Sequence, residues 1–227
     1  MSGPDILFED GEALVIDKPA GLPVDRPRAG GASLADRLDL LRLGFVRAPV
    51  AVHRLDTDTS GCLLLARNPK ALRRFSRAFE ERQVEKIYLG IVAGHLEEDS
   101  GDIMLSLAKI SSERAGWRMI VAKSGKPART VWRRLAVKDG LTLVEFRPET
   151  GRTHQIRVHA EHGLGSALLG DPVYGASLGS TDQRAARTML HASALRVKRD
   201  GKPDIAALAP FPADFARLGF AAPPPAW

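Results

Sequence analysis

The chain has 227 residues, of which 44% are hydrophobic and 26% are charged. That composition argues against a disordered or fibrous protein and is enough for one substantial core. The 33 basic and 27 acidic residues give a formal net charge of +6, which favours polyanionic partners such as nucleic acids. A single cysteine, Cys62, permits no internal disulfide, and no stretch is long and apolar enough to span a bilayer. We therefore expect a cytoplasmic protein that does not enter a membrane.

Apolar periodicity and turn signals predict a strand-rich chain with few helices. In chain order we expect strands at 6–8 and 13–16, a helix over 33–44 capped by Ser33, strands at 51–56 and 62–66, and a helix from Pro69 to about Arg82. Strands at 86–94, 117–122, 129–137 and 141–147, a helix from about Thr153 to Gly163, strands at 190–197 and 205–209 and a short helix near 212–218 follow. The expected loops and turns are 18–31, 95–101 and 170–175, and 178–190 contains a polar stretch that looks mobile. Because the strands come in consecutive pairs, an α+β fold with a mixed or antiparallel sheet is favoured.

The segment HRLDTDTSG (53–61) concentrates polar residues between two apolar runs. If 51–56 is extended, Asp56 lies where the strand turns, so its carboxylate can be held rigidly and still face a cleft. Asp and Ser before Gly are also ordinary turn formers, and Asp58 fits that role. Taken alone, this segment is compatible with a catalytic carboxylate and with a simple turn.

Tyr88 lies in the strand-like segment KIYLGIVAG (86–94). Strand alternation puts Lys86 and Tyr88 on the same face. A tyrosine that points into a cleft can stack on a base and move protons through its hydroxyl, whereas a tyrosine in a half-buried sheet simply packs. The residues alone leave both interpretations open.

A third polar segment is ETGRTHQIRVH (149–159). On a helix, His154 and Arg157 are three residues apart and share a face. Arg152 and the backbone N–H groups of the first turn would form an anion site. The histidines of this region do not have the spacing of a metal site and no cysteine assists them, so no metal is predicted.

Seven segments occur in the order seen in RluA-type RNA pseudouridine synthases: KPAGLPV, HRLDTDTSG, KIYLGIVAG, GKPARTVW, ETGRTHQIRVH, GDPVYG and LHA. The chain resembles that family from about residue 17 to residue 208. The resemblance implies the pseudouridine-synthase fold, a mixed and mainly antiparallel sheet flanked by helices and loops around a central RNA-binding cleft. Because KPAGL occurs within the first 22 residues, we expect a single catalytic domain over 1–227 with no separate N-terminal S4 domain.

Proteins that look like this isomerise specific uridines to pseudouridine in structured ribosomal or transfer RNA, breaking the N1–C1′ bond and rejoining the base through C5. The resemblance makes Asp56 the essential aspartate, which either attacks C1′ or abstracts the 2′ proton. It makes Tyr88 the residue that stacks on the flipped base and handles protons, and Arg157 the partner of Asp56. An arginine beside a carboxylate favours its charged form and fixes its direction. The expected RNA-binding residues are Arg54, Arg152 and His154.

An isomerisation needs no net redox or hydrolytic step, so neither a cofactor nor a metal is expected. The expected partner is an RNA loop or bulge, because duplex RNA offers side chains little sequence readout. We expect a monomer without a protein partner. Arginines on the 69–82 helix and around 129–134 could contact phosphates or simply form a solvated face.

Two other functions compete with this interpretation. A glycoside hydrolase would need two carboxyl groups flanking one bond, whereas the matched segments supply one Asp opposite an Arg. A non-catalytic RNA-binding module would not require Asp56, Tyr88 and Arg157 together.

Overall fold

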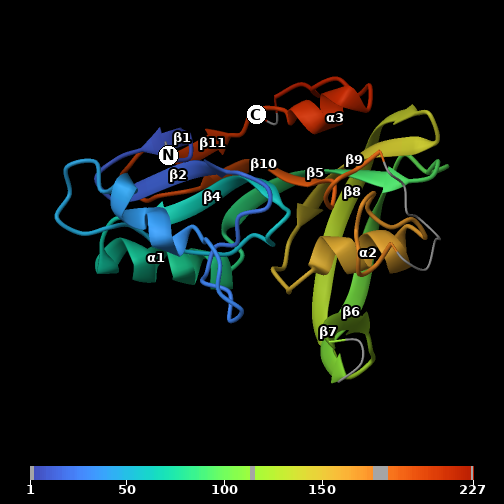
Figure 1. Ribbon diagram of the computed structural model, residues 1–227, viewed down its shortest axis with the longest axis horizontal. Coiled ribbons are helices and arrows are strands. Elements are labelled where there is room, and N and C mark those ends of the chain that lie inside the picture. Colours follow the sequence, from blue (N-terminus) through green and yellow to red (C-terminus); the bar gives the residue numbers. More distant parts are fainter. Residues whose placement is uncertain (1–2, 113–115, 176–183, 226) are drawn as a thin grey trace. The chain divides into compact units, whose positions relative to one another are not determined.

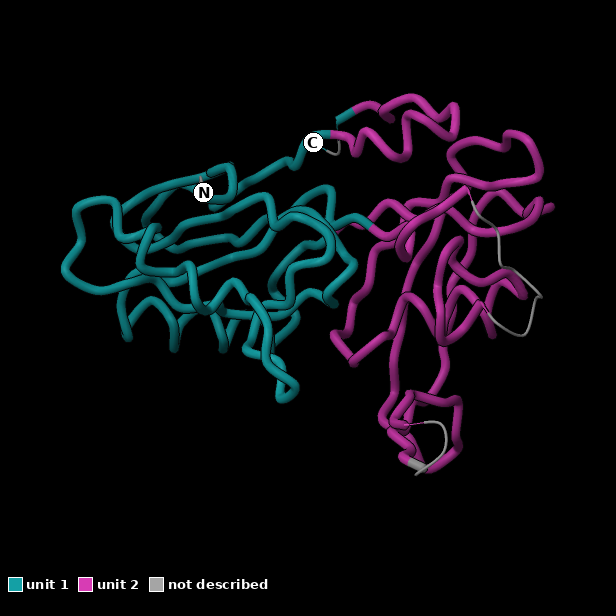
Figure 2. Tube along the Cα trace, in the orientation of Figure 1, with its two compact units in different colours: residues 1–86, 191–210, 225–227 teal, residues 87–190, 211–224 magenta. Residues whose placement is uncertain are grey.

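A computed structural model describes residues 3–112, 116–175, 184–225 and 227. The chain divides into two compact units, shown in Figure 2. Unit 1 comprises Met1–Lys86, His191–Pro210 and Pro225–Trp227, and unit 2 comprises Ile87–Leu190 and Phe211–Pro224. The chain leaves unit 1 within strand β5 (Val84–Ala93) and returns to it at the start of strand β10 (Leu190–Val197).

The sheet of unit 1 is mixed. Strand β2 (Ala13–Lys18) is antiparallel to both β1 (Ile6–Glu9) and β4 (Ser60–Ala66), and the short β3 (Val50–Ala51) also pairs antiparallel with β4. Strand β10 runs parallel to β4 and antiparallel to β11 (Ile205–Leu208). The predicted opening hairpin and the strands at 62–66, 190–197 and 205–209 are thereby confirmed.

Helix α1 (Pro69–Glu80) covers one face of the unit 1 sheet (Figure 1). Asn68 caps it by accepting a hydrogen bond from the N–H of Ala71 at 2.9 Å, and Pro69 occupies the first turn, as predicted. Phe75 is 1% exposed and packs among the apolar side chains of β2 and β4. The helix ends two residues earlier than expected, because Arg82 takes a left-handed φ of 60° and the N–H of Gln83 turns back to the carbonyl of Ala78.

Two predictions for unit 1 are wrong in detail. The expected helix at 33–44 is a 3₁₀ helix, η1 (Ala35–Leu41), and Ser33 does not cap it through a side-chain bond to its backbone. The Ser33 hydroxyl instead donates to the Asp36 carboxylate at 2.6 Å. The expected strand at 51–56 ends at Ala51, because the N–H of Leu64 in β4 donates to the side chain of His53, where a continuing strand would have offered a backbone acceptor.

The sheet of unit 2 is antiparallel throughout, in the order β5, β9 (Leu141–Pro148), β8 (Lys126–Lys138), β6 (Ser100–Ser112), β7 (Gly116–Val121). All six strands predicted between residues 86 and 209 are present in the two units with small shifts of their ends, but a seventh strand, β6, was missed. Its first two residues had been assigned to a polar turn. Ile103 and Leu107 are buried in β6, but the apolar Met104 and Ile110 on the opposite face and Lys109 on the same face as Leu107 hid the alternation.

Helix α2 (Gln155–Gly163) packs against the sheet of unit 2. A Cβ at Gly163 would lie 2.6 Å from a side-chain carbon of Ile103, and Ile156 and Ala160 belong to the same apolar cluster as Trp132. Helix α3 (Ala213–Arg217) adds the fully buried Phe215 to the second cluster of this unit. Helices and strands together confirm the α+β class. Of the stretch 178–190 predicted to look mobile, residues 178–183 lie outside the described residues.

Candidate active site

Asp56 lies in the loop between β3 and β4, half-buried, between the exposed Arg54 and a turn. The N–H of Thr59 donates to the carbonyl of Asp56 at 3.1 Å, which closes the turn that the sequence predicted here. Leu55, 6% exposed, anchors the loop in the interior. The backbone at Asp56 is therefore fixed on both sides of the residue while its side chain keeps access to solvent.

The Asp56 loop is braced by a buried ammonium group. Lys18, at the end of β2, is fully buried, and its Nζ donates to the carbonyl oxygens of Pro19 and Leu22, each at 2.8 Å, and of Thr57 at 3.0 Å. The N–H of Gly21 donates to the same Thr57 oxygen at 2.9 Å. A buried charge is tolerated only when such bonds replace its water. The KPAGL segment and the residue that follows Asp56 are thus joined, a role that sequence reasoning missed although KPAGL had been singled out.

His53 fixes the other end of the same loop. Its Nε2 accepts the N–H of Leu64 at 3.0 Å, and its ring stacks on Phe79 with a centroid distance of 4.6 Å. Burial, together with the positive charge of Lys86, lowers the pKa of His53 to about 3. Because an accepting nitrogen must carry no proton, the neutral ring is the form that this bond needs. Burial also lowers the pKa of Lys86 to about 8.

The strand that follows the turn requires a glycine. Gly61 has a φ of 105°, and a Cβ there would lie 2.2 Å from the carbonyl oxygen of Ala192. The pair is part of the parallel contact of β4 with β10, where the Ser60 hydroxyl is hydrogen-bonded to His191 Nδ1 at 2.9 Å. The segments HRLDTDTSG and LHA, about 130 residues apart in the chain, therefore meet in unit 1.

Arg54, a predicted RNA-binding residue, has a side chain that is 78% exposed and forms an ion pair with Asp25 at 2.9 Å. An ion pair this exposed contributes little stability and exchanges easily with other anions.

In unit 2, Arg157 is held by a carboxylate that sequence reasoning did not identify. Its Nε and Nη2 donate to the two carboxylate oxygens of Asp171 at 2.6 and 2.8 Å, and both side chains are buried. Asp171, from the GDPVYG segment, also accepts the N–H groups of Val173 and Tyr174. Burial alone would raise the pKa of this carboxyl, but Arg157 and the two N–H groups outweigh it and leave the pKa below its ordinary value. The pairing of Arg157 with Asp56, a residue of the other unit, stays a prediction.

His154 and Arg157 both contact Tyr174, although His154 precedes α2 and does not share a helical face with Arg157 as predicted. His154 Nδ1 is hydrogen-bonded to the Tyr174 hydroxyl at 3.0 Å, and the Arg157 guanidinium carbon lies 5.1 Å from the centre of the Tyr174 ring. Helix α2 begins at Gln155, two residues later than expected, because His154 takes a left-handed φ of 52°. Tyr174 is 3% exposed and was not named from the sequence.

A buried amide positions the segment before α2. Gln155 Oε1 accepts from the Thr150 hydroxyl at 2.7 Å and from the N–H of Arg152 at 3.0 Å. Its Nε2 donates to the carbonyl of Arg129 and the hydroxyl of Thr130, both at 2.9 Å. Arg152 is half-buried and its Nε donates to the carbonyl of Pro127 at 3.2 Å. The predicted anion-binding role of Arg152 stays a prediction.

Tyr88 lies on β5 directly opposite Phe146 of β9. It is half-buried and packs at the edge of the apolar cluster that contains Phe146 and Ile156. This placement is compatible with packing and with stacking on a base, so its assigned role stays a prediction.

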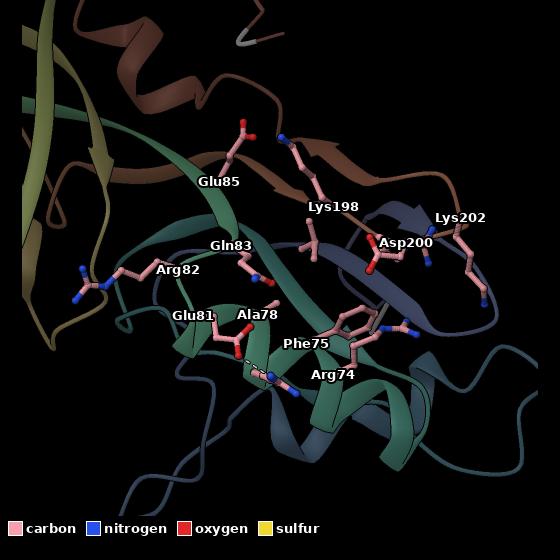
Figure 3. A pocket seen from close by; sticks show the side chains of 13 residues that line it. Arg74, Phe75, Ala78, Glu81, Arg82, Gln83, Glu85, Lys198, Asp200 and Lys202 are labelled. Atoms are coloured by element: carbon pink, nitrogen blue, oxygen red, sulfur yellow. Dashed lines mark hydrogen bonds and ion pairs between the residues drawn. The ribbon is translucent and has the colours of Figure 1, made fainter.

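The basic face of α1 borders a pocket of about 740 Å³ in unit 1, between the helix and the segment that joins β10 to β11 (Figure 3). Its basic lining residues are Arg74, Arg77, Arg82, Lys198, Arg199 and Lys202. Acidic partners neutralise several of them: Arg74 and Lys202 pair with Glu12, Arg77 pairs with Glu81, and Arg199 pairs with Asp10. These ion pairs are what a solvated surface with internally neutralised charges would show, so the pocket supports that interpretation at least as well as a phosphate-binding site.

Among the described residues, no group of three or more His, Cys, Asp or Glu side chains is arranged to hold a metal ion. In the same part of the chain, no helix has the length and apolar character needed to cross a membrane. Cys62 is buried, which raises the pKa of its thiol to about 12, so it is not a reactive nucleophile.

The family model described as RNA pseudouridylate synthase matches residues 12–162. The chain is 54% identical over 215 residues to an uncharacterized RNA pseudouridine synthase of Zymomonas mobilis, covering 95% of this chain and 97% of that protein. It is 40% identical over 223 residues to ribosomal large subunit pseudouridine synthase D of Nitrosomonas europaea, covering 94% of this chain and 63% of that protein.

Solved structures agree with the sequence matches. Human RNA pseudouridylate synthase domain containing 4 superposes with a TM-score of 0.78 at 25% identity, covering 96% of this chain and 94% of that one. Human RNA pseudouridylate synthase domain containing 1 gives a TM-score of 0.76 at 32% identity, covering 92% and 84%. The chain therefore belongs to the RNA pseudouridine synthase family, whose members are isomerases that act on RNA.

Proposed function

We propose that this protein isomerises specific uridines to pseudouridine in structured RNA, with Asp56 as the catalytic carboxylate. The carboxylate either attacks C1′ or removes the 2′ proton. In both cases the N1–C1′ bond breaks, the base turns, and C5 forms the new bond to C1′ while the C5 proton is lost and N1 gains one. This isomerisation consumes no oxidant or reductant and needs no metal, so we assign the protein no cofactor.

The observation that carries the proposal is the double bracing of the Asp56 loop. Lys18 holds the backbone just after Asp56 and His53 holds it three residues before, yet the Asp56 side chain is half-exposed. Catalytic groups need a backbone that is fixed and a side chain that the substrate can reach. A turn that served only to reverse the chain would not need a fully buried ammonium group.

Arg157 and Tyr88 are assigned supporting roles. The bidentate bonds to Asp171 fix the plane of the Arg157 guanidinium, so that it is preorganised for a second anionic group. We assign that second group to the Asp56 carboxylate, and to Tyr88 a stacking contact with the extruded base. Extruding the base costs a few kcal/mol, and stacking on an aromatic ring recovers roughly 1–3 kcal/mol of it.

The substrate that we propose is ribosomal RNA, with transfer RNA as the alternative. Its support is the relative from Nitrosomonas europaea, which is named as a large-subunit ribosomal pseudouridine synthase. Arg54, Arg152 and His154 would contact the RNA. We further propose that residues 1–227 act as one catalytic domain, as a cytoplasmic monomer that needs no protein partner.

The test is the Asp56→Asn variant, compared with wild type in a tritium-release assay on bulk ribosomal and transfer RNA labelled at C5 of uridine. Asp58→Asn is the matched control, because Asp58 lies in the same turn and is assigned no chemistry. We expect Asp56→Asn to bind RNA normally and to release no tritium, and Asp58→Asn to keep most of the activity. Turnover by Asp56→Asn close to that of wild type would remove Asp56 from its role.

The RNA target is identified by mapping pseudouridines in ribosomal and transfer RNA from cells with and without the gene. We expect one or a few ribosomal uridines to remain unmodified in the deletion. Restoring the gene should restore these positions, whereas the Asp56→Asn allele should not. Identical maps in both strains would contradict the proposed substrates.

A further inference from the structure

A large aromatic side chain is exposed on the β6–β7 hairpin of unit 2. Trp117 is 46% exposed and pairs with Ser111 across the hairpin. Strand alternation puts Trp117 on the same face as Met119 and Leu107. These two are buried and pack with Val158 of α2, whereas Trp117, the next position outward on the same face, is exposed.

Trp117 is connected to the residues around Arg157. Its ring lies 4.9 Å from that of His154 at an angle of 32°, and His154 is hydrogen-bonded to the Tyr174 hydroxyl. The same hydroxyl accepts the N–H of Met119 at 3.0 Å, so the hairpin backbone is fixed two residues from Trp117. Tyr174 is held in turn by Asp171, the partner of Arg157. A rigid chain of contacts therefore joins the exposed indole to the buried arginine.

A flexible cation covers part of the indole. The Nζ of Lys109 lies 4.7 Å from the centre of the Trp117 ring, and the Lys109 side chain is exposed. An exposed ammonium over a ring is held more weakly than a stacked nucleobase. A base can therefore displace Lys109 from the indole, and the ammonium then lies within reach of the phosphate next to that base.

We propose that Trp117 and Lys109 form a binding position for an unpaired nucleotide of the RNA substrate, with the base stacked on the indole and the phosphate paired with the ammonium. This inference rests on the proposed function, since it assumes an RNA substrate, and it adds a specificity for single-stranded rather than duplex RNA. A paired base offers no free face to the indole.

The chemistry around Trp117 favours RNA over a protein partner. Among the described residues of this face, the exposed ones next to Trp117 are Lys109 and Ser111, which are charged or polar, and the exposed Val121 lies beyond the buried Met119, so the indole is not the centre of a broad apolar patch. The chain as a whole carries a net charge of +6, which attracts phosphates.

The experiment measures the binding of a short single-stranded oligouridylate, and of an RNA duplex of the same length, by tryptophan fluorescence and by filter binding. Wild type is compared with Trp117→Ala, Trp117→Phe and Trp117→Leu. Trp227→Phe changes the other tryptophan that is exposed among the described residues, and Ile110→Ala changes an exposed apolar side chain on the opposite face of the hairpin. Both serve as controls.

We expect single-stranded RNA to quench the fluorescence of wild type, of Trp227→Phe and of Ile110→Ala, and to leave that of Trp117→Phe almost unchanged. Trp117→Ala and Trp117→Leu should bind the oligouridylate about tenfold more weakly, while Trp117→Phe should stay within about threefold of wild type because it keeps an aromatic face. The affinity for the duplex should change by less than about twofold in every variant. In turnover, Trp117→Leu should raise KM for RNA and leave kcat unchanged.

Equal affinity of wild type, Trp117→Ala and Trp117→Leu for the oligouridylate would overturn the inference, as would an equal loss for the duplex. Because Trp117→Leu keeps a bulky apolar side chain, its affinity for the oligouridylate tests the inference if Trp117→Ala does not fold. The binding measurements are repeated with Asp56→Asn protein. If RNA quenches the fluorescence of that variant but wild type shows no turnover, the proposed function is contradicted and this inference stands. If wild type turns over RNA but Trp117→Leu leaves KM unchanged, this inference is contradicted and the proposed function stands.

Discussion

Replacing Lys18 by Met tests whether the buried ammonium group holds the Asp56 loop. Methionine keeps the apolar side chain as far as Cε and removes the ammonium donors to Pro19, Leu22 and Thr57. Three charge-assisted hydrogen bonds contribute roughly 5–9 kcal/mol in total at about 1.5–3 kcal/mol each. Burying the ammonium group costs several kcal/mol, and this cost is absent in the variant, so it offsets part of the loss. We expect a net loss of about 2–4 kcal/mol in the free energy of unfolding.

The assay is urea-induced unfolding followed by circular dichroism, together with kcat for tritium release. Because Thr57 directly follows Asp56, we expect kcat to fall at least about tenfold even under conditions where the variant is folded. Lys70→Met, which changes an exposed lysine at the start of α1, is the matched control and should change stability by less than about 0.5 kcal/mol. If Lys18→Met and Lys70→Met behave alike in both measurements, the ammonium does not brace the loop.

Three further predictions concern both units. Gly61→Ala should unfold unit 1 or destabilise it by more than about 3 kcal/mol, because its Cβ would meet the carbonyl of Ala192 at a left-handed φ; thermal unfolding close to that of wild type would contradict this. Asp171→Asn should cost roughly 3–5 kcal/mol in urea unfolding, because the buried Arg157 loses its carboxylate partner. We also expect kcat of Asp171→Asn to fall, and full activity of this variant would show that Arg157 takes no part in the reaction. His159 is fully buried, and burial, opposed by the charge of Asp102, lowers its pKa to about 4. As the pH falls below about 6.5, His159 takes up a proton in the unfolded chain but not yet in the folded one. The free energy of unfolding therefore decreases between pH 6.5 and about 4. His159→Leu should reduce that loss by on the order of 2 kcal/mol, and equal pH profiles of urea unfolding would contradict it.

The helices and most strands could be predicted because they depend on local patterns. Asn68 and Pro69 start α1 by capping chemistry, and CLLLA forms part of β4 because it is uniformly apolar. The prediction of a strand at 51–56 was wrong because the side chain of His53 replaces a backbone acceptor for the N–H of Leu64. Such a contact between residues 53 and 64 leaves no periodic signal in the sequence.

The candidate catalytic residues were predicted individually, but the residues that hold them in place were not predicted. Asp56, Tyr88 and Arg157 were assigned through family motifs, whereas Lys18 and Asp171 act through bonds across 39 and 14 residues. No composition or spacing rule identifies which carbonyl a buried lysine will meet. The left-handed conformation of His154 was likewise invisible, because Thr-His-Gln is compatible with a helical start and the backbone departs from it only in contact with Tyr174.

The discontinuity of unit 1 has a consequence during synthesis of the protein. Its sheet contains β10, whose residues leave the ribosome more than a hundred positions after those of β4. Until then Gly61 has no Ala192 opposite it and Ser60 no His191, so the nascent chain carries the Asp56 loop on an unfinished sheet. Since domains fold as units, the amino-terminal third waits for the carboxy-terminal strands, and a ribosome that stalls near residue 190 releases an inactive chain with an open edge at β4.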